Sequence, residues 1–218
     1  MGNFKMLQLS TPVIGILRGV EEDFFGELLG VAFAAGLQAL EVTSNTPGAE
    51  RMVARFRPGV AGNKLLGMGT IRNLAEAQRA VAAGAMFLVS PNCDREVIGF
   101  ANDQRVPIIS GALTPSEVYR AFVAGAEMVK VFPCGALGGP RYIADLRGPF
   151  EQIPLVAVGG VTSHNAGEYL AAGAAAVGVG GSLFGTRALA EQDLTAIDAN
   201  IREFIARLQS AGGRELHG

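Results

Sequence analysis

Short apolar runs rich in β-branched residues recur along the chain, and segments with helical spacing separate them. Apolar runs of this length, bounded by glycine, proline or polar residues, are typical of buried strands. The spacing predicts strands at 12–18, 38–43, 64–70, 86–91, 106–111, 128–133, 154–160 and 175–181. Between them, stretches such as LAEAQRAVAAG and TPSEVYRAFVAG place their apolar residues on one helical face. Thr114, Pro115 and Glu117 have the N-cap, first-turn proline and capping-box spacing of a helix start.

Strand and helix alternate eight times, which predicts parallel βαβ units. Eight units in about 180 residues favour a (β/α)8 TIM barrel, a single α/β domain that covers residues 1–218. An open, doubly wound sheet has the same alternation and is the alternative. An amphipathic helix at about 191–211 is expected to close the barrel, and 212–218 are expected to form a loose tail.

Four segments share one pattern, in which a helix end is followed by Ala-Gly and then by a strand. They are FAAGLQALEV, VAAGAMFLVS, FVAGAEMVKV and LAAGAAAVGV, and their glycines are Gly36, Gly84, Gly125 and Gly173. Glycine suits the left-handed residue that often follows a helix. The offset from Gly36 to Gly125 equals that from Gly84 to Gly173, which indicates two equivalent half-barrels.

The fifth residue after each repeat glycine is Glu41, Val89, Lys130 or Gly178. Inward side chains of alternate barrel strands form layers, so these four residues are expected to share one layer near the carboxyl ends of the strands. A buried structural ion pair is one interpretation of Glu41 and Lys130. The favoured interpretation is catalytic, because a desolvated lysine supplies the free amine that attacks a ketone. The carboxylate would then move protons, as in a Schiff-base aldolase that needs no metal or other cofactor.

Two glycine-rich loops follow the seventh and eighth predicted strands. They contain Gly159 and Gly160, and Gly181 and Ser182. Backbone N–H groups in such loops approach anions closely, and this is where TIM barrels often bind phosphate. Tight turns without a ligand are the alternative.

Three further residues end predicted strands at the same mouth of the barrel. Arg18 could bind a carboxylate with two hydrogen bonds, and a surface salt bridge is its alternative role. Thr70 and Pro91 could shape the same pocket.

Charge and composition exclude several other classes of protein. The net charge of −2 provides no basic surface for nucleic acid or an anionic membrane, and no apolar run is long enough to span a bilayer. The two cysteines, Cys93 and Cys134, form no disulfide framework, and MGNFKMLQLS lacks the apolar run of a signal peptide. A cytoplasmic protein is therefore expected.

The motifs EVTxNTPGA, GMGT, VSPN, KVFPxxALGGPxYIxxLRGPF, VGGV and GGSLF together resemble the bacterial 2-keto-3-deoxy-6-phosphogluconate (KDPG) and ketohydroxyglutarate (KHG) aldolases, over residues 12–184. The resemblance implies a homotrimeric TIM barrel and a class I aldolase that releases pyruvate. It implies that Lys130 forms the Schiff base and Glu41 is the acid/base. Thr70 and Pro91 then match the pyruvate pocket. Gly159, Gly160, Gly181 and Ser182 match the phosphate site.

The substrate implied by this resemblance is a 2-keto-3-deoxy-6-phospho sugar acid, cleaved to pyruvate and glyceraldehyde 3-phosphate, with 4-hydroxy-2-oxoglutarate as a further substrate. Two departures, Asn45 where the phosphogluconate enzymes have arginine and Val158 where they have threonine, resemble the phosphogalactonate branch, whose substrate is the C4 epimer. ALGGPRYIADLRGPF resembles the phosphogluconate branch. A phosphosugar epimerase or synthase, and a non-catalytic sugar-phosphate-binding protein, are the alternatives outside aldolase chemistry.

Overall fold

The structure is a computed structural model and describes residues 9–212 of the chain. The strands are β1 Val13–Leu17, β2 Ala39–Thr43, β3 Leu65–Gly69, β4 Leu88–Val89, β5 Ile108–Ala112, β6 Met128–Val131, β7 Leu155–Val158 and β8 Ala176–Val179. The helices are α1 Glu22–Ala34, α2 Ala49–Phe56, α3 Leu74–Ala82, α4 Arg95–Asp103, α5 Pro115–Val123, α6 Pro140–Arg147, α7 Ala166–Ala171, α8 Gly181–Phe184, α9 Thr186–Ala190 and α10 Leu194–Gly212. Two short 3-10 helices, η1 Arg57–Gly59 and η2 Gly135–Leu137, lie in the connections.

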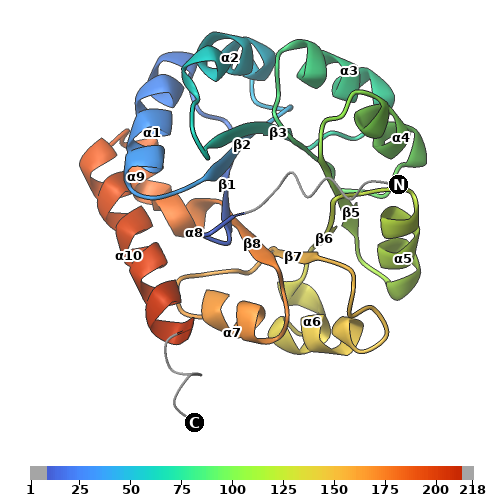
Figure 1. The fold of residues 1–218 in the computed structure, drawn as a ribbon. Coiled ribbons are helices and arrows are strands. Elements are labelled where there is room, and N and C mark those ends of the chain that lie inside the picture. The colour runs from blue at the N-terminus through green and yellow to red at the C-terminus, as the bar shows by residue number, and fades with distance from the viewer. Residues whose placement is uncertain (1–8, 213–218) are drawn as a thin grey trace.

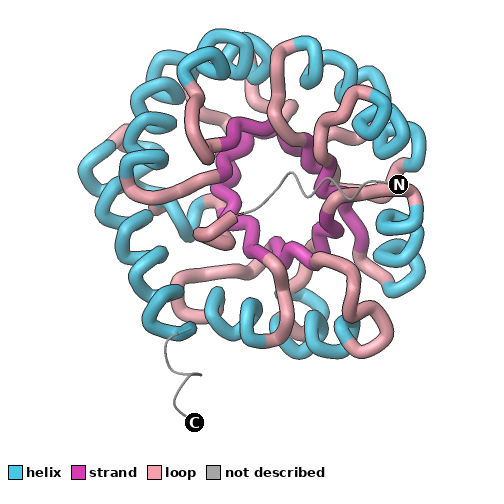
Figure 2. Tube along the Cα trace, viewed as in Figure 1, coloured by secondary structure: helices cyan, strands magenta, loops and turns pink. Residues whose placement is uncertain are grey.

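The eight strands form a closed parallel barrel in sequence order, and β1 pairs with both β2 and β8. Figure 1 shows the helices as an outer ring around these strands, and Figure 2 shows the same ring of strands enclosed by helices. The predicted single-domain TIM barrel is confirmed, and the open doubly wound sheet is wrong.

Several strands are shorter than their apolar runs. The clearest case is β4, which comprises only Leu88 and Val89 where the sequence predicted 86–91. Proline has no N–H to donate to a ladder, so pairing stops before Pro91. The hydroxyl of Ser90 donates to the carbonyl of Asn92 at 2.8 Å, and this contact turns the chain away from the strand direction.

The repeat glycines have one geometry in all four copies. Gly36, Gly84, Gly125 and Gly173 have φ of +109°, +92°, +101° and +99°. This is the left-handed conformation that glycine adopts without the penalty of a Cβ. Each glycine ends a helix in the same way, and β2, β6 and β8 begin at the third residue after their glycines, whereas the shorter β4 begins at the fourth.

The hydrophobic core has two parts. The larger part fills the layer between strands and helices and includes Phe25, Leu28, Met52 and Phe204. The smaller part lies inside the barrel and consists of Ile14, Ala39, Phe87, Val89, Ile109, Val156, Val158 and Ala176. Apolar side chains therefore fill much of the interior of the barrel.

The long helix α10 corresponds to the closing helix expected at 191–211, and its buried face includes Ile197, Ile201, Phe204 and Leu208. It lies beside α1 and α7 in Figure 1. Of the tail expected at 212–218, Gly212 ends α10, and 213–218 lie outside the described residues. No helix in the described part of the chain is long and apolar enough to cross a membrane.

Candidate active site

The four residues expected in one layer line a single cavity. Glu41 on β2, Val89 on β4, Lys130 on β6 and Gly178 on β8 meet there, with an apolar wall of Ile14, Ile16, Ile109, Val156 and Val158. A Cβ at position 178 would lie 2.8 Å from Cγ2 of Val158, so glycine is what keeps this side of the cavity open. The site thus holds two ionisable groups within apolar surroundings.

Glu41 is 1% exposed, and its Oε2 has no hydrogen-bond partner among the described residues. Burial raises the pKa of Glu41 from 4.5 to about 7, although the positive charges of Lys130 and Arg18 act in the opposite direction. The carboxylate lies against the backbone of Gly69 on β3. A Cβ at position 69 would lie 2.7 Å from Oε2 and closer still to Oε1. A carboxyl with this pKa both accepts and releases protons near neutral pH.

Lys130 is 7% exposed and pairs in the sheet with Gly111 and Val156. Burial lowers the pKa of Lys130 below 10.5, and Arg18 lowers it further, whereas Glu41 raises it. Its Nζ lies 5.0 Å from the centre of the Phe132 ring, an arrangement that favours the charged amine. The net direction is toward free amine, the form that attacks a carbonyl carbon.

Arg18 and Thr70 meet at the rim of the cavity. Arg18 follows β1 directly and is exposed, and its Nη2 donates to Oγ1 of Thr70 at 3.5 Å. Thr70 follows β3 and has φ +59°, in the left-handed region. A guanidinium and a hydroxyl side by side can together bind a carboxylate.

Pro91 is folded over the end of β5. A Cβ on Gly111 would overlap the backbone of Pro91, and the N–H of Gly111 donates to Oγ of Ser90 at 3.1 Å. Gly111 is the partner of Lys130 in the β5–β6 register. The proline is therefore fixed against the strand next to the lysine.

The two glycine loops differ in how they are held. Gly159 and Gly160 have φ of +92° and +80°, and the N–H of Gly135 donates to the carbonyl of Gly159 at 2.9 Å. Asn165 Nδ2 donates to the carbonyl of Gly160 at 3.0 Å. These contacts give both carbonyls hydrogen-bond partners within the chain. Gly181 and Ser182 begin α8, and both are exposed.

The two positions expected to set specificity have different surroundings. Val158, at the end of β7, is 6% exposed and lines the cavity. Asn45 lies in the loop after β2 and is exposed. The structure thus brings Val158 to the buried cavity and leaves Asn45 at the rim.

Four residues that hold the site were not singled out from the sequence: Ser44, Thr46, Gly69 and Ser90. Oγ1 of Thr46 accepts from the N–H of Gly19 at 3.0 Å, which ties the loop of Arg18 to the loop after β2. For Gly69 a signal did exist, because a glycine inside a strand often marks a close approach of another group. Serine and threonine in loops are too common for their positions alone to mark them.

Other reactive groups are less suited to chemistry. Cys134 is buried, and its burial raises the pKa of the thiol to about 11, which disfavours the nucleophilic thiolate. Among residues 9–212, no group of three or more His, Cys, Asp or Glu side chains is placed to hold a metal ion.

The fold is a TIM barrel with an amine and a carboxyl in one buried cavity, and comparison with known proteins gives the family. Residues 7–200 match the family model described as KDPG and KHG aldolase, so the chain belongs to that family of pyruvate aldolases, which are lyases. It is 33% identical to 2-dehydro-3-deoxy-6-phosphogalactonate aldolase of Escherichia coli K12, over 81% of this chain and 86% of that protein.

Solved structures agree with the sequence comparison. A native KDPGal structure superposes with a TM-score of 0.88 at 30% identity, over 95% of this chain and 98% of that one. KDPG aldolase from Legionella pneumophila superposes with a TM-score of 0.82 at 29% identity, over 88% and 93% of the two chains. That structure contains pyruvate captured at low pH as a covalent carbinolamine intermediate. The family thus forms a covalent bond to its substrate without a cofactor.

Proposed function

We propose that the protein cleaves a 2-keto-3-deoxy-6-phospho sugar acid to pyruvate and glyceraldehyde 3-phosphate, with Lys130 as the Schiff-base lysine and Glu41 as the acid/base. The observation that carries this assignment is the shared cavity. Burial lowers the pKa of the Lys130 amine and raises the pKa of the Glu41 carboxyl to about 7, so the two pKa values move toward each other. Two groups whose pKa values converge in this way can exchange protons with a substrate between them.

The reaction begins when the free amine of Lys130 adds to the C2 carbonyl carbon and forms a carbinolamine. Glu41 supplies the proton with which hydroxide leaves as water, and an iminium remains. The Glu41 carboxylate then takes the proton of the C4 hydroxyl as the C3–C4 bond breaks. The electron pair of that bond moves into the iminium to form an enamine, and the aldehyde leaves. Protonation at C3 and addition of water release pyruvate and restore the amine.

The two ends of the substrate are assigned to opposite parts of the mouth. Arg18 and Thr70 bind the carboxylate next to C2, and Pro91 forms an apolar wall for the pyruvate part. The loops that contain Gly159, Gly160, Gly181 and Ser182 bind the phosphate through backbone N–H groups and the serine hydroxyl.

The phosphogalactonate epimer is the substrate that Val158 favours. Its side chain lies in the buried wall next to Gly178, and it has no hydrogen bond to offer a C4 hydroxyl. A site that lacks a polar partner for a substrate hydroxyl discriminates against the epimer that needs one. Asn45, exposed at the rim in place of arginine, supports the same assignment.

A coupled pyruvate assay tests the proposed substrate. The two C4-epimeric 6-phospho acids and 4-hydroxy-2-oxoglutarate are compared at equal concentrations, and kcat/KM is expected to be highest for the phosphogalactonate epimer. Equal or higher kcat/KM for the phosphogluconate epimer would contradict the epimer assignment. Absence of pyruvate from all three would contradict the reaction, and would leave an epimerase, a synthase or a binding protein.

Borohydride reduction with pyruvate tests the lysine. Mass spectrometry is expected to locate a stable adduct on Lys130 and none in Lys130→Met. Lys64 provides a matched control, because its Nζ lies 5.4 Å over the ring of Phe33, as Lys130 does over Phe132. Lys64→Met should keep the adduct. An adduct on another lysine would refute the assignment.

The proposed assembly is a homotrimer, as the family resemblance implies. Exposed apolar side chains at Tyr119, Val123 and Leu137 provide surface that association would bury. Light scattering of the purified protein measures the mass of the particle, and a monomer or dimer at micromolar concentration would refute the proposal.

A further inference from the structure

Thr70 has an unusual backbone for its residue type. Its φ of +59° places a β-branched residue in the left-handed region, where the side chain crowds the backbone. Two other described non-glycine residues have positive φ, Arg105 and Gln192, and both follow the end of a helix, where this conformation is common. Thr70 instead follows strand β3, so local chain geometry does not account for its conformation.

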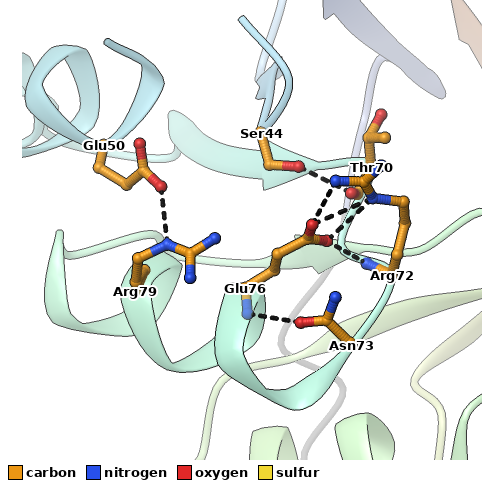
Figure 3. Close-up of polar contacts among 7 residues, drawn as sticks. All are labelled: Ser44, Glu50, Thr70, Arg72, Asn73, Glu76 and Arg79. Carbon is orange, nitrogen blue, oxygen red and sulfur yellow. Dashed lines mark hydrogen bonds and ion pairs between the residues drawn. The ribbon is translucent and has the colours of Figure 1, made fainter. Parts of the chain in front are cut away.

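Ser44 directly follows β2 and donates hydrogen bonds to two consecutive carbonyls, those of Gly69 and Thr70, which lie on either side of the Thr70 N–Cα bond. Its N–H donates to the carbonyl of Gly69 at 2.8 Å, and its hydroxyl donates to the carbonyl of Thr70 at 2.7 Å. Figure 3 shows the Ser44 side chain directed at Thr70. Because the two carbonyls belong to consecutive residues, hydrogen bonds to both of them restrict rotation about the Thr70 N–Cα bond.

The chain beyond Thr70 is anchored separately. The N–H of Ile71 donates to the carbonyl of Val89 at 3.0 Å, and the N–H of Arg72 donates to Oε2 of Glu76 at 2.7 Å. Figure 3 shows the Glu76 carboxylate bound to Arg72 and the Glu76 N–H bound to the side chain of Asn73. These contacts fix where the loop goes, whereas Ser44 acts on the orientation of Thr70 itself.

We propose that Ser44 is a positioning residue: it keeps Thr70 in the left-handed conformation that directs the Thr70 hydroxyl toward the substrate carboxylate beside Arg18. The proposal rests on the proposed function, in which Arg18 and Thr70 bind that carboxylate. Serine can have this role because its side chain is short. Its N–H binds the carbonyl of Gly69, and its hydroxyl reaches the carbonyl of the next residue, Thr70.

The test measures the pyruvate concentration that gives half the maximal rate of borohydride inactivation. Ser44→Ala is expected to raise this concentration about three- to tenfold, less than the complete loss of one hydrogen bond to a charged group would cause, because the Thr70 hydroxyl is displaced and not removed. The maximal rate should stay within about twofold, because Lys130 and Glu41 are unchanged. Ser44→Thr keeps a hydroxyl and should restore most of the affinity.

Ser210→Ala is the matched control. The Ser210 hydroxyl also donates to a backbone carbonyl at 2.7 Å, that of Ala206 on α10, remote from the cavity. This variant should leave the half-saturating concentration unchanged. Urea unfolding of each variant shows whether loss of stability accounts for any difference.

A double-mutant cycle separates positioning from any direct effect. Thr70→Val removes the hydroxyl and keeps the branched side chain. In that background, Ser44→Ala should not raise the half-saturating concentration further. Independent, additive effects, or an unchanged concentration in Ser44→Ala alone, would overturn the inference. If the wild-type protein forms no pyruvate adduct, the proposed function fails instead, so the two failures are distinguishable.

Discussion

The carboxylate of Glu41 lies where a side chain of Gly69 would begin. Gly69 is the last residue of β3 and lacks a positive φ, so alanine fits its backbone, and the three atoms nearest to the added Cβ all belong to the Glu41 carboxyl group. Gly69→Ala is therefore expected to displace Glu41 and lower kcat by about 10² or more, as the loss of a general acid/base does.

Gly30→Ala on α1 is the control for this variant, because a Cβ at position 30 meets no atom within 4 Å. It should keep full activity. The measurement is the steady-state rate of pyruvate release, with circular dichroism to establish folding. Wild-type kcat in Gly69→Ala would show that Glu41 does not need its present position.

Glu41 should make the folded protein less stable as the pH rises, which is the reverse of the usual effect of a carboxylate in an ion pair. Its folded pKa of about 7 is above its ordinary value of 4.5, so the folded state binds a proton more tightly than the unfolded state. The resulting stability is complete below pH 4.5 and is lost as the pH rises through about 7. Between those values the wild type should lose about 3 kcal/mol relative to Glu41→Gln.

Urea denaturation of both proteins at several pH values measures this difference directly. Because the comparison is a change with pH, the constant effect of the amide on packing cancels. A stability difference that stays constant between pH 4.5 and 8 would mean that the carboxyl titrates normally.

The Glu76 carboxylate should stabilise the folded protein at neutral pH and lose this effect as the pH falls, opposite to Glu41. Arg72 lowers the pKa of Glu76 through its side-chain hydrogen bond, and the carboxylate also accepts from the Arg72 N–H. Its contribution is complete above pH 4.5 and falls as the pH drops through the lowered folded pKa. Glu76→Gln should cost ~1–2 kcal/mol at pH 7 and less under acidic conditions, measured by urea denaturation.

Glu191 provides the comparison, since it directly follows α9, pairs with Arg187 of that helix at 2.8 Å, and both side chains are exposed. Glu191→Gln should change stability by less than ~0.5 kcal/mol at any pH. Glu76 is 7% exposed, and equal effects at the two positions would show that its burial does not strengthen the ion pair.

Val158→Thr should shift the epimer preference toward the phosphogluconate acid. Threonine has nearly the shape of valine and adds one hydroxyl in the cavity wall. The ratio of kcat/KM for the two epimers is expected to change by about tenfold. Val156→Thr, on the same strand and also lining the cavity, tests whether any added hydroxyl suffices. A ratio altered equally by both variants would remove the special role of position 158.

Much of the fold and the central pair could be predicted because both follow from periodicity. The repeat glycines set the strand register, and counting from them along the sequence is enough to place Glu41 and Lys130 in one layer. The supporting contacts could not be placed in this way. The hydrogen bond from Ser44 to Thr70 depends on a single left-handed residue, and no composition pattern predicts that a threonine adopts it.

The ends of strands were also beyond prediction. The strand predicted at 86–91 includes Ser90 and Pro91, but β4 stops at Val89, where Ser90 bonds to the carbonyl of Asn92 and the backbone of Pro91 lies against Gly111. The end of the strand therefore depends on a local turn and also on a neighbour in the barrel that is about 20 residues away in sequence.

The equal offsets between the repeat glycines bear on the ancestry of the barrel. If one half had been duplicated, positions 41 and 130 would at first have held the same residue. Two glutamates facing one dry cavity would have competed for a single proton, and two lysines would have repelled each other. Neither arrangement combines a nucleophile with a proton carrier. A pair of one acid and one amine therefore requires that the two copies diverged. Under that history, the cavity existed before it contained both a glutamate and a lysine.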